Sequence, residues 1–232
     1  MIHNKKENEV NIVFEYCDKN LFQAMQDRAR KNQSWNEQEI KTVMYQCVAA
    51  INYMHKNGYM HRDVKPENYL INNTSGPLAA DQIQIKLADF GLAKDFRSNG
   101  SGKFTEYVAT RWYRAPELVL RTSNYNQSVD IFALGAIMAE LYLGRPIFPG
   151  VNETDQLTRI VTVLGTPTSS EWPEGIQLAQ QKGIQIPQVT GTSLRQHFAS
   201  TTRGDISDEA FDLMAKMFKY ASDQRITAAQ CL

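Results

Sequence analysis

Three short runs hold most of the side chains that could do chemistry. They are His-Arg-Asp-Val-Lys-Pro-Glu-Asn at 61–68, Asp-Phe-Gly at 89–91 and Ala-Pro-Glu at 115–117. Asn68 and Asp89 carry oxygen donors, which a hard cation requires. Lys65 places an ammonium group two residues after the Asp63 carboxylate. An isolated Asp-Phe-Gly arises by chance in many proteins, but the three runs in this order and spacing form a specific combination.

This combination resembles the catalytic loop, the metal-binding turn and the end of the activation segment of eukaryotic Ser/Thr protein kinases. The resemblance covers nearly all 232 residues. It is strongest to the group that contains the mitogen-activated and cyclin-dependent kinases (CMGC), and within it to the male-germ-cell-associated subgroup. The supporting runs are RWYRAPE at 111–117, IMAEL at 137–141, GRPIFPG at 144–150, GTP at 165–167, and FEYC at 14–17 followed by NL at 20–21.

The resemblance implies a role in phosphoryl transfer for each polar residue of these runs. Asp63 would be the catalytic base, Lys65 would offset the charge of the transferred phosphoryl group, and Thr110 would bridge these two side chains. Asn68 and Asp89 would hold Mg²⁺. Lysine at the position of Lys65 is typical of Ser/Thr kinases rather than tyrosine kinases. The expected cofactors are therefore ATP and Mg²⁺, and the expected substrates are Ser or Thr residues of proteins.

Residues near the N-terminus resemble the part of a kinase that binds the adenosine of ATP. The resemblance places a gatekeeper at Phe14, backbone contacts to adenine at Glu15 and Cys17, a ribose contact at Asn20, and the floor under the base at Leu70. Lys65 would reach the phosphates. The resemblance starts late, because no glycine-rich phosphate loop, strand lysine or helix glutamate precedes these residues.

Both ends of the sequence look cut within structural elements. We expect residues 1–17 to be a remnant of the small lobe with the hinge, and residues 18–232 to be the C-terminal lobe, with an activation segment at 89–117. A shortened version of a longer protein explains these ends better than natural loss of the small lobe, which remains the alternative.

Thr105-Glu106-Tyr107 lies ten residues before Ala-Pro-Glu. It resembles the activation lip of mitogen-activated and male-germ-cell-associated kinases. Phosphorylation of Thr105 and Tyr107 would add about −1.5 to −2 charges at each site, which need cationic partners, preferably Arg. The basic candidates are Arg62 and Lys94 for phospho-Thr105, and Arg111 and Arg114 for phospho-Tyr107. The alternative is that these side chains only solvate the loop.

A further set of residues is expected to hold the lobe together. By resemblance, His61 and Phe90 should stack inside the lobe. Asp130 would anchor the backbone of the catalytic loop, which supplies the donors that a buried carboxylate needs. Glu117 and Arg225 match a buried ion pair of the family. The alternative for that pair is two unrelated surface charges.

Composition limits the classes of function. The 25 basic and 25 acidic residues give zero net charge, so nothing in the whole-chain charge favours nucleic-acid or anionic-membrane binding. The three cysteines match no metal pattern and are expected to be reduced thiols. Residues 1–9 are polar and carry no apolar stretch, so we do not expect them to be a signal peptide. We expect an intracellular, cytoplasmic monomer, with the nucleus and the cilium left open, whose partners are protein substrates and an upstream activating kinase.

The pattern of apolar residues predicts an α+β arrangement, with strands in the first part of the chain and helices behind. The resemblance implies a protein kinase-like fold, which is mostly the helical large lobe with only the last strand and the hinge of the small lobe. The most apolar segment, 129–143, is too short to span a membrane and reads as a core helix. The expected strands are 11–16, 69–71 and 83–87. The expected helices are 20–30, a helix between a capping box at 34–37 and Gly58, 129–143, 153–164, 208–219 and one starting at Ala221. Residues 165–203 read as irregular loops.

Two functions follow. The first is a proline-directed Ser/Thr kinase that is switched on by phosphorylation of Thr105 and Tyr107. The second is a catalytically inactive fragment or pseudokinase-like scaffold that binds protein partners. The complete set of Asp63, Lys65, Asn68 and Asp89 would favour the first, whereas the missing small lobe favours the second for this chain taken literally; the upstream coding sequence would discriminate between them.

Overall fold

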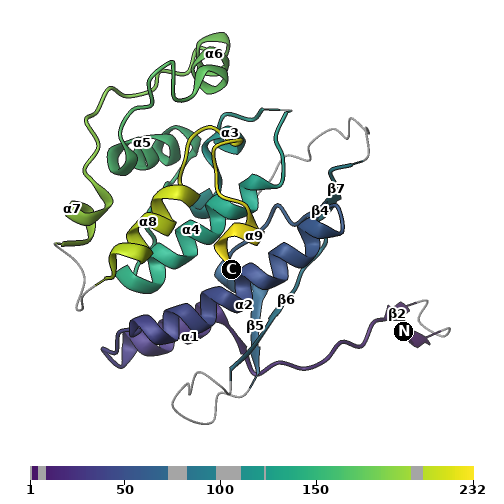
Figure 1. The fold of residues 1–232 in the computed structure, drawn as a ribbon. Helices are drawn as coiled ribbons and strands as arrows, with labels where there is room; N and C mark the ends of the chain where they lie inside the picture. The colour runs from purple at the N-terminus through teal and green to yellow at the C-terminus, as the bar shows by residue number, and fades with distance from the viewer. Residues whose placement is uncertain (1, 5–8, 73–82, 98–110, 123, 200–205) are drawn as a thin grey trace.

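The computed structural model describes residues 2–4, 9–72, 83–97, 111–122, 124–199 and 206–232. Helices form most of the body, and a small antiparallel sheet lies along one side of it (Figure 1). The two central helices are α2 (Glu37–Lys56) and α4 (Ser128–Leu143), which pack against each other. The α+β class expected from the sequence is confirmed.

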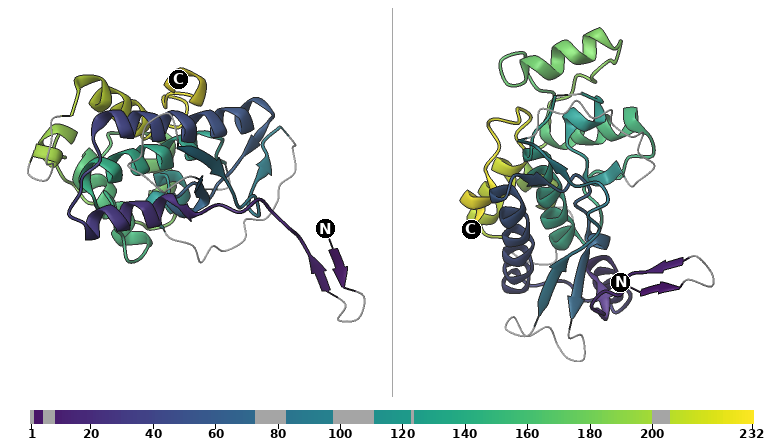
Figure 2. Two further views of the ribbon diagram at one scale, coloured as in Figure 1. Left: turned by 90° about the horizontal axis from the view of Figure 1, so that it is seen from below. Right: turned by 90° about the vertical axis from the view of Figure 1, so that its right-hand side faces the viewer.

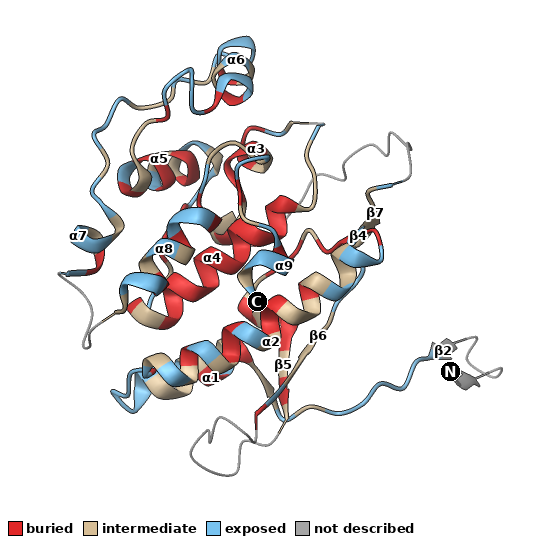
Figure 3. Ribbon diagram, viewed as in Figure 1, coloured by how far each residue is buried: buried red, intermediate tan, exposed pale blue. Residues whose placement is uncertain are grey.

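Helix α4 is the centre of the core. All of its residues except Tyr142 are buried, so Figure 3 shows it red along almost its whole length. A helix that is apolar on all sides belongs in a protein core or a membrane. Here the rings of Phe132, Phe148 and Phe218 meet beside it, with centroids 5.2–5.8 Å apart. None of the described helices is both long and apolar enough to cross a bilayer.

The helices before α4 begin at side-chain caps. Asn20 caps α1 (Leu21–Arg30). The capping box expected at 34–37 is wrong, because Asn36 and Glu39 form the box that starts α2: each side chain bonds the other residue's backbone N–H at 2.9 Å. The Glu37 carboxylate does not take part in the capping box and accepts a hydrogen bond from the Ser207 hydroxyl. Helix α2 ends before Gly58, whose φ of 87° requires a residue without Cβ.

Short strands set the position of the loop that follows α2. Strands β3 (Lys19–Asn20), β5 (Tyr69–Asn72) and β6 (Gln84–Leu87) form one antiparallel sheet in the order β3-β5-β6. The side chain of Gln46 in α2 bonds Ile83 O and Ile85 N, which ties the edge of β6 to the helix. Strand β4 (Tyr59–Met60) pairs with β7 (Lys94–Asp95). The strands expected at 69–71 and 83–87 are therefore confirmed.

The strand expected at 11–16 is wrong. Strand β2 (Glu9–Asn11), paired with β1 (Ile2–Asn4), includes only the first of these residues. The exposed fractions of Ile12, Val13 and Phe14 are 60–80%, and Figure 2 shows this segment extending away from the body. A β-prone run becomes a strand only where a neighbouring strand satisfies its N–H and C=O groups, and residues 12–16 pair with no described strand.

The second half of the chain is mostly helical, and two of the elements predicted there from the sequence are wrong. Residues 165–203 are not all irregular, since they contain α6 and α7. The last helix starts at Ala228 rather than Ala221, because Thr227 caps it and accepts from Gln230 N. The elements are η2 (Arg111–Tyr113), α3 (Pro116–Val119), α5 (Glu153–Leu164), α6 (Pro173–Gln181), α7 (Leu194–Ala199), α8 (Asp208–Met217) and α9 (Ala228–Cys231).

Candidate active site

The loop at 61–68 lies between β4 and β5 and is anchored on α4. Asp130, only 1% exposed, accepts hydrogen bonds from the backbone N–H of His61 and Arg62, both at 2.8 Å. His55 Nε2 lies 2.9 Å from the same carboxylate. These contacts match the anchoring expected of Asp130. They also hold Arg62 at a φ of 68°, a left-handed conformation that costs a non-glycine residue about 1–2 kcal/mol.

Asp63, Lys65 and Asn68 converge at the end of this loop. Lys65 Nζ lies 2.7 Å from Asp63 Oδ2, and Asn68 Nδ2 donates to the same oxygen at 3.1 Å and to Asp63 O at 2.7 Å. The short 3-10 helix η1 (Pro66–Asn68) brings Asn68 back to Asp63. Within the described part of the chain, no hydrogen bond falls on Asp63 Oδ1. That oxygen is the one placed to accept a proton.

The proposed magnesium ligands lie next to each other in the fold. Ala88 N donates to Asn68 O at 2.8 Å, which places the residue before Asp89 against Asn68. Because the amide nitrogen of Asn68 is used by Asp63, its amide oxygen is left for a cation. Asp89 is exposed and has a left-handed φ of 61°.

This donor set fits Mg²⁺. Two side-chain oxygens from the protein, with further ligands from phosphates and water, are the usual arrangement for this ion in phosphate-handling enzymes. The described residues contain no group of three His, Cys, Asp or Glu that could form a closed metal centre. Asn68 and Asp89 would therefore hold the ion together with a phosphate-bearing ligand.

The ring contact expected between His61 and Phe90 is present, but it is not enclosed. The two rings meet edge to face with centroids 5.7 Å apart. His61 is fully buried, whereas Phe90 is 55% exposed, so the expectation that both lie inside the lobe is wrong for Phe90. The reason is that Phe90 packs on the loop from outside, and no described residue covers its other side enough to bury it.

The residues expected at the nucleotide end are only partly brought together. Asn20 and Leu70 are direct partners in the β3–β5 pair, and the Asn20 side chain also caps α1. Cys17 is half-buried. The exposed Glu15 carboxylate bonds Lys86 Nζ, which lowers the pKa of Glu15. Since adenine is expected to contact backbone groups here, this ion pair leaves the expectation for Glu15 and Cys17 untouched.

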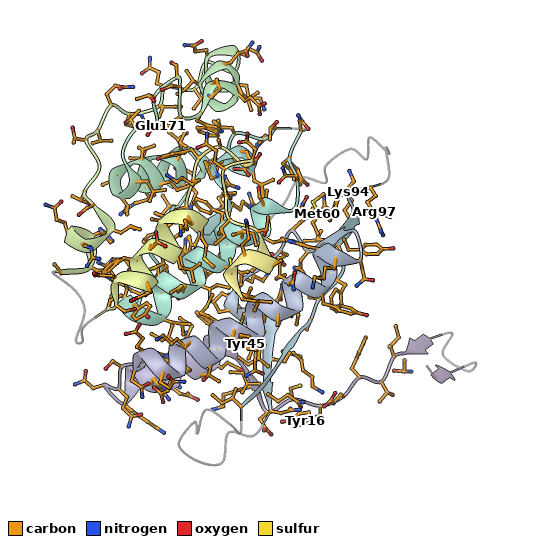
Figure 4. All side chains as sticks on the ribbon, viewed as in Figure 1. Tyr16, Tyr45, Met60, Lys94, Arg97 and Glu171 are labelled. Atoms are coloured by element: carbon orange, nitrogen blue, oxygen red, sulfur yellow. The ribbon has the colours of Figure 1, made fainter. Side chains whose placement is uncertain are left out.

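Thr105, Tyr107 and Thr110 lie outside the described residues, so their expected roles stay predictions. The expected phosphate-binding residues form two groups. Lys94 lies opposite Met60 in the β4–β7 pair, with Arg97 close by (Figure 4). The others belong to the catalytic loop, which holds Arg62, and to η2 and the residue after it, which are Arg111 and Arg114.

The arginines near the catalytic loop differ in their surroundings. Arg62 and Arg114 line one small cavity with Asp63. Arg62 Nε donates to Leu92 O at 2.6 Å. Arg111 Nε is buried and has no hydrogen-bond partner among the described residues. A buried, unpaired guanidinium N–H is costly, which is consistent with the expected pairing of Arg111 with an anion.

Glu117 and Arg225 form the expected ion pair. Arg225 Nη1 and Nη2 lie 2.5 and 2.7 Å from the two Glu117 carboxylate oxygens, and both residues are buried. Arg225 also donates to Lys219 O and Tyr220 O. The pair thus joins α3 to the turn before α9, and the alternative of two unrelated surface charges is excluded.

Sequence reasoning missed an acidic pair beside the loop. Glu140 of α4 is 4% exposed, and Tyr113 OH donates to its Oε2 at 2.7 Å. Burial above all, and also the nearby Glu67 carboxylate, raises the pKa of Glu140 to about 7, against the hydrogen bond from Tyr113. Glu67 Oε2 is itself buried without a partner among the described residues. The available signal was a second acid, besides Asp130, within the apolar run 129–143.

This raised pKa predicts how stability depends on pH. The unfolded chain loses the Glu140 proton near its ordinary value of 4.5 and the folded chain near 7. Between these values the folded state binds more protons, so the free energy of unfolding falls as pH rises. Glu140→Gln keeps an acceptor for Tyr113 but cannot ionise. Its stability relative to wild type should rise between pH 4.5 and 8 by up to roughly 3 kcal/mol, measured by urea unfolding.

A control for this prediction is Glu171→Gln. Hydrogen bonds from Thr168 lower the pKa of the exposed Glu171 below its ordinary value of 4.5. The stability that this carboxylate contributes is lost only as pH falls below that value, so the difference in stability between Glu171→Gln and wild type should stay constant from about pH 5 to 8. A difference between wild type and Glu140→Gln that stays constant across this pH range would contradict the prediction.

Comparison with known proteins agrees with this geometry. A sequence model of the protein kinase domain family matches residues 2–232. Human serine/threonine-protein kinase MAK is 42% identical over 98% of the chain, mouse serine/threonine-protein kinase ICK 40% over 98%, and rice cyclin-dependent kinase F-4 41% over 98%. The aligned region covers 34%, 33% and 46% of these relatives, so the chain spans less than half of their length.

Proposed function

Because the chain belongs to the protein kinase domain family, we propose that the protein containing it transfers a phosphoryl group from ATP to Ser or Thr hydroxyl groups of protein substrates. The observation that carries this proposal is the convergence of Asp63, Lys65 and Asn68 within hydrogen-bond distance. These residues also lie beside the turn that holds Asp89. The names of the relatives, which are Ser/Thr and cyclin-dependent kinases, support the same reaction.

Each residue has a task that its surroundings suit. Asp63, through the oxygen that no described group bonds, accepts the proton of the substrate hydroxyl. Lys65, held at 2.7 Å from Asp63, places a positive charge where negative charge develops in the transition state. Asn68 and Asp89 hold Mg²⁺ and so orient the phosphates. Bound Mg·ATP supplies the transferable phosphoryl group and neutralises part of its charge.

The finer assignments extend this proposal. Ser or Thr followed by Pro is the proposed target, since the run at 111–117 resembles that of the proline-directed group. Phosphorylation of Thr105 and Tyr107 by an upstream kinase is the proposed switch, supported by the arginines around the catalytic loop. We also propose that residues 1–17 belong to the small lobe and the hinge, that residues 18–232 form the C-terminal lobe, and that the protein is an intracellular, cytoplasmic monomer.

Nucleotide binding tests the metal and hinge residues directly. The protein that contains this chain should melt at a higher temperature with Mg·ATP than with ATP and EDTA. At a hundredfold excess over Kd the gain in stability is about 2.7 kcal/mol, or roughly 5–10 °C for a domain of this size. Asp89→Ala should lose the Mg²⁺-dependent part of the shift, whereas Asp212→Ala, an exposed aspartate on α8, should keep it.

Transfer itself is measured with radiolabelled ATP and paired peptides that carry Ser-Pro or Ser-Ala. Labelling of Ser in both, with preference for Ser-Pro, supports the full proposal. Labelling without preference would overturn only the proline-directed part. If neither a Mg²⁺-dependent shift nor labelling is found with the full-length protein, the kinase assignment is wrong and the scaffold function takes its place.

A further inference from the structure

Arg62, next to the candidate base, is held by its backbone and by its side chain. It directly precedes Asp63, its backbone is left-handed with φ 68°, and its N–H is bonded to Asp130. A strained backbone of this kind persists only where the surroundings hold it from several directions. The contact with Asp130 restrains only the backbone of Arg62, so its side chain must be restrained by other contacts.

Two contacts hold the Arg62 guanidinium. Its Nε donates to Leu92 O at 2.6 Å, and its Nη1 donates to the hydroxyl of Tyr125 at 2.9 Å. Leu92 lies three residues after Asp89, and Tyr125 lies three residues before α4. The side chain therefore connects the catalytic loop, the turn that carries the metal-binding aspartate, and the chain that leads into the core helix.

Tyr125 is suited to this contact. It is half-buried, and burial raises the pKa of Tyr125 although the Arg62 charge opposes this, so its hydroxyl stays neutral at pH 7 and can accept from the guanidinium. Because the contact is partly shielded from water, its loss is not fully replaced by solvent. Its length of 2.9 Å is ordinary for a hydrogen bond from a charged donor.

Resting on the proposed kinase function, we propose that Tyr125 is a positioning residue for catalysis, which fixes Arg62 through its hydroxyl and thereby fixes the relative placement of Asp63 and the Asp89 turn. Tyr125 does not touch the reacting groups. Its effect passes through the Arg62 side chain, which no other described residue on the α4 side bonds. This role is separate from that of Asp130, which holds the backbone of the same loop.

The test is Tyr125→Phe in the full-length protein, which removes one oxygen atom and keeps the ring. Misplacement of a catalytic group lowers turnover rather than ground-state binding. We expect kcat to fall roughly tenfold while KM for ATP and for a Ser-Pro peptide stays within about twofold. In an Arg62→Met background, Tyr125→Phe should cause no further fall in kcat.

The matched control is Tyr220→Phe. Tyr220 is also half-buried, and its hydroxyl donates to Gly165 O at 2.6 Å, far from the catalytic loop in the sequence. The Tyr220→Phe variant should lose some thermal stability but keep the wild-type kcat. An unchanged kcat in Tyr125→Phe, or an equal fall in kcat in both variants, would overturn the proposal, as would a full further effect in the Arg62→Met background.

A second variant covers the case in which Tyr125→Phe does not fold. Arg62→Lys keeps the charge but lacks the fork that reaches Leu92 and Tyr125 together, and it should show a similar fall in kcat; wild-type turnover would overturn the proposal. If the wild-type protein transfers no phosphate, the proposed function fails separately. In that case the contact between Arg62 and Tyr125 is tested by amide hydrogen exchange. Exchange of residues 61–68 should be faster in Tyr125→Phe and unchanged in Tyr220→Phe.

Discussion

Replacing Asp63 by Asn is expected to lower kcat for phosphoryl transfer by about a hundredfold to ten-thousandfold. An amide cannot accept the proton of the substrate hydroxyl, so the proposed catalytic base is lost. The fold should survive, because the amide oxygen of Asn can still accept from Lys65 Nζ and Asn68 Nδ2, which both bond Asp63 Oδ2. Initial rates at saturating Mg·ATP and peptide measure the effect, and thermal unfolding checks the fold.

Asp27→Asn is the control for this substitution. Asp27 on α1 is also paired with a lysine, since Lys19 Nζ lies 2.8 Å from its Oδ2. Asp27 lies outside the candidate site, so the Asp27→Asn variant should have the kcat of the wild type. Turnover of Asp63→Asn within about tenfold of wild type, at normal stability, would show that Asp63 is not the base.

The second large effect concerns the buried ion pair between Glu117 and Arg225. Glu117→Ala leaves the Arg225 guanidinium, whose side chain is fully buried, without its bidentate partner. Breaking a buried pair from one side costs about 3–5 kcal/mol, which corresponds to roughly a 10 °C fall in melting temperature for a domain of this size. Calorimetry and urea unfolding measure the two quantities.

An exposed pair provides the comparison. Arg195 and Asp208 also form an ion pair, but their side chains are 55% and 83% exposed. Exposed pairs contribute at most about 1 kcal/mol, so Asp208→Ala should change the melting temperature little. In addition, the double variant Glu117→Ala with Arg225→Met should be more stable than Glu117→Ala alone, because the unpaired charge is gone. If Glu117→Ala lowered the melting temperature no more than Asp208→Ala, the pair of Glu117 and Arg225 would not stabilise the fold.

Local patterns in the sequence predicted the elements that depend on near neighbours. The apolar stripe from Ile40 to Met54 predicted α2, and the apolar run 129–143 predicted the core helix α4. Helix periodicity depends on residues three and four apart, so it can be read from a single segment. The helix cap at Asn36 was misplaced by two residues, because Ser34 and Asn36 both precede a glutamate at the capping distance.

Elements that need distant partners were predicted less well. Residues 12–16 have strand propensity, yet they pair with no described strand and are exposed. Helices α6 and α7 were missed in a region rich in Pro, Gly, Ser and Thr. In α6 the proline stands at the first helical position, where its missing N–H costs nothing, and Ala179 of this helix is buried.

The sequence by itself determined the family, because the runs that hold Asp63, Lys65, Asn68 and Asp89 are local patterns typical of protein kinase domains. Only the tertiary structure decided which contacts position these groups and how burial changes the pKa values of the carboxylates near them. Arg62 meets Tyr125 across 63 residues and Arg225 meets Glu117 across 108, and burial raises the pKa of Glu140. Contacts at such separations and the loss of solvent depend on the packing of the whole chain, which no local pattern records.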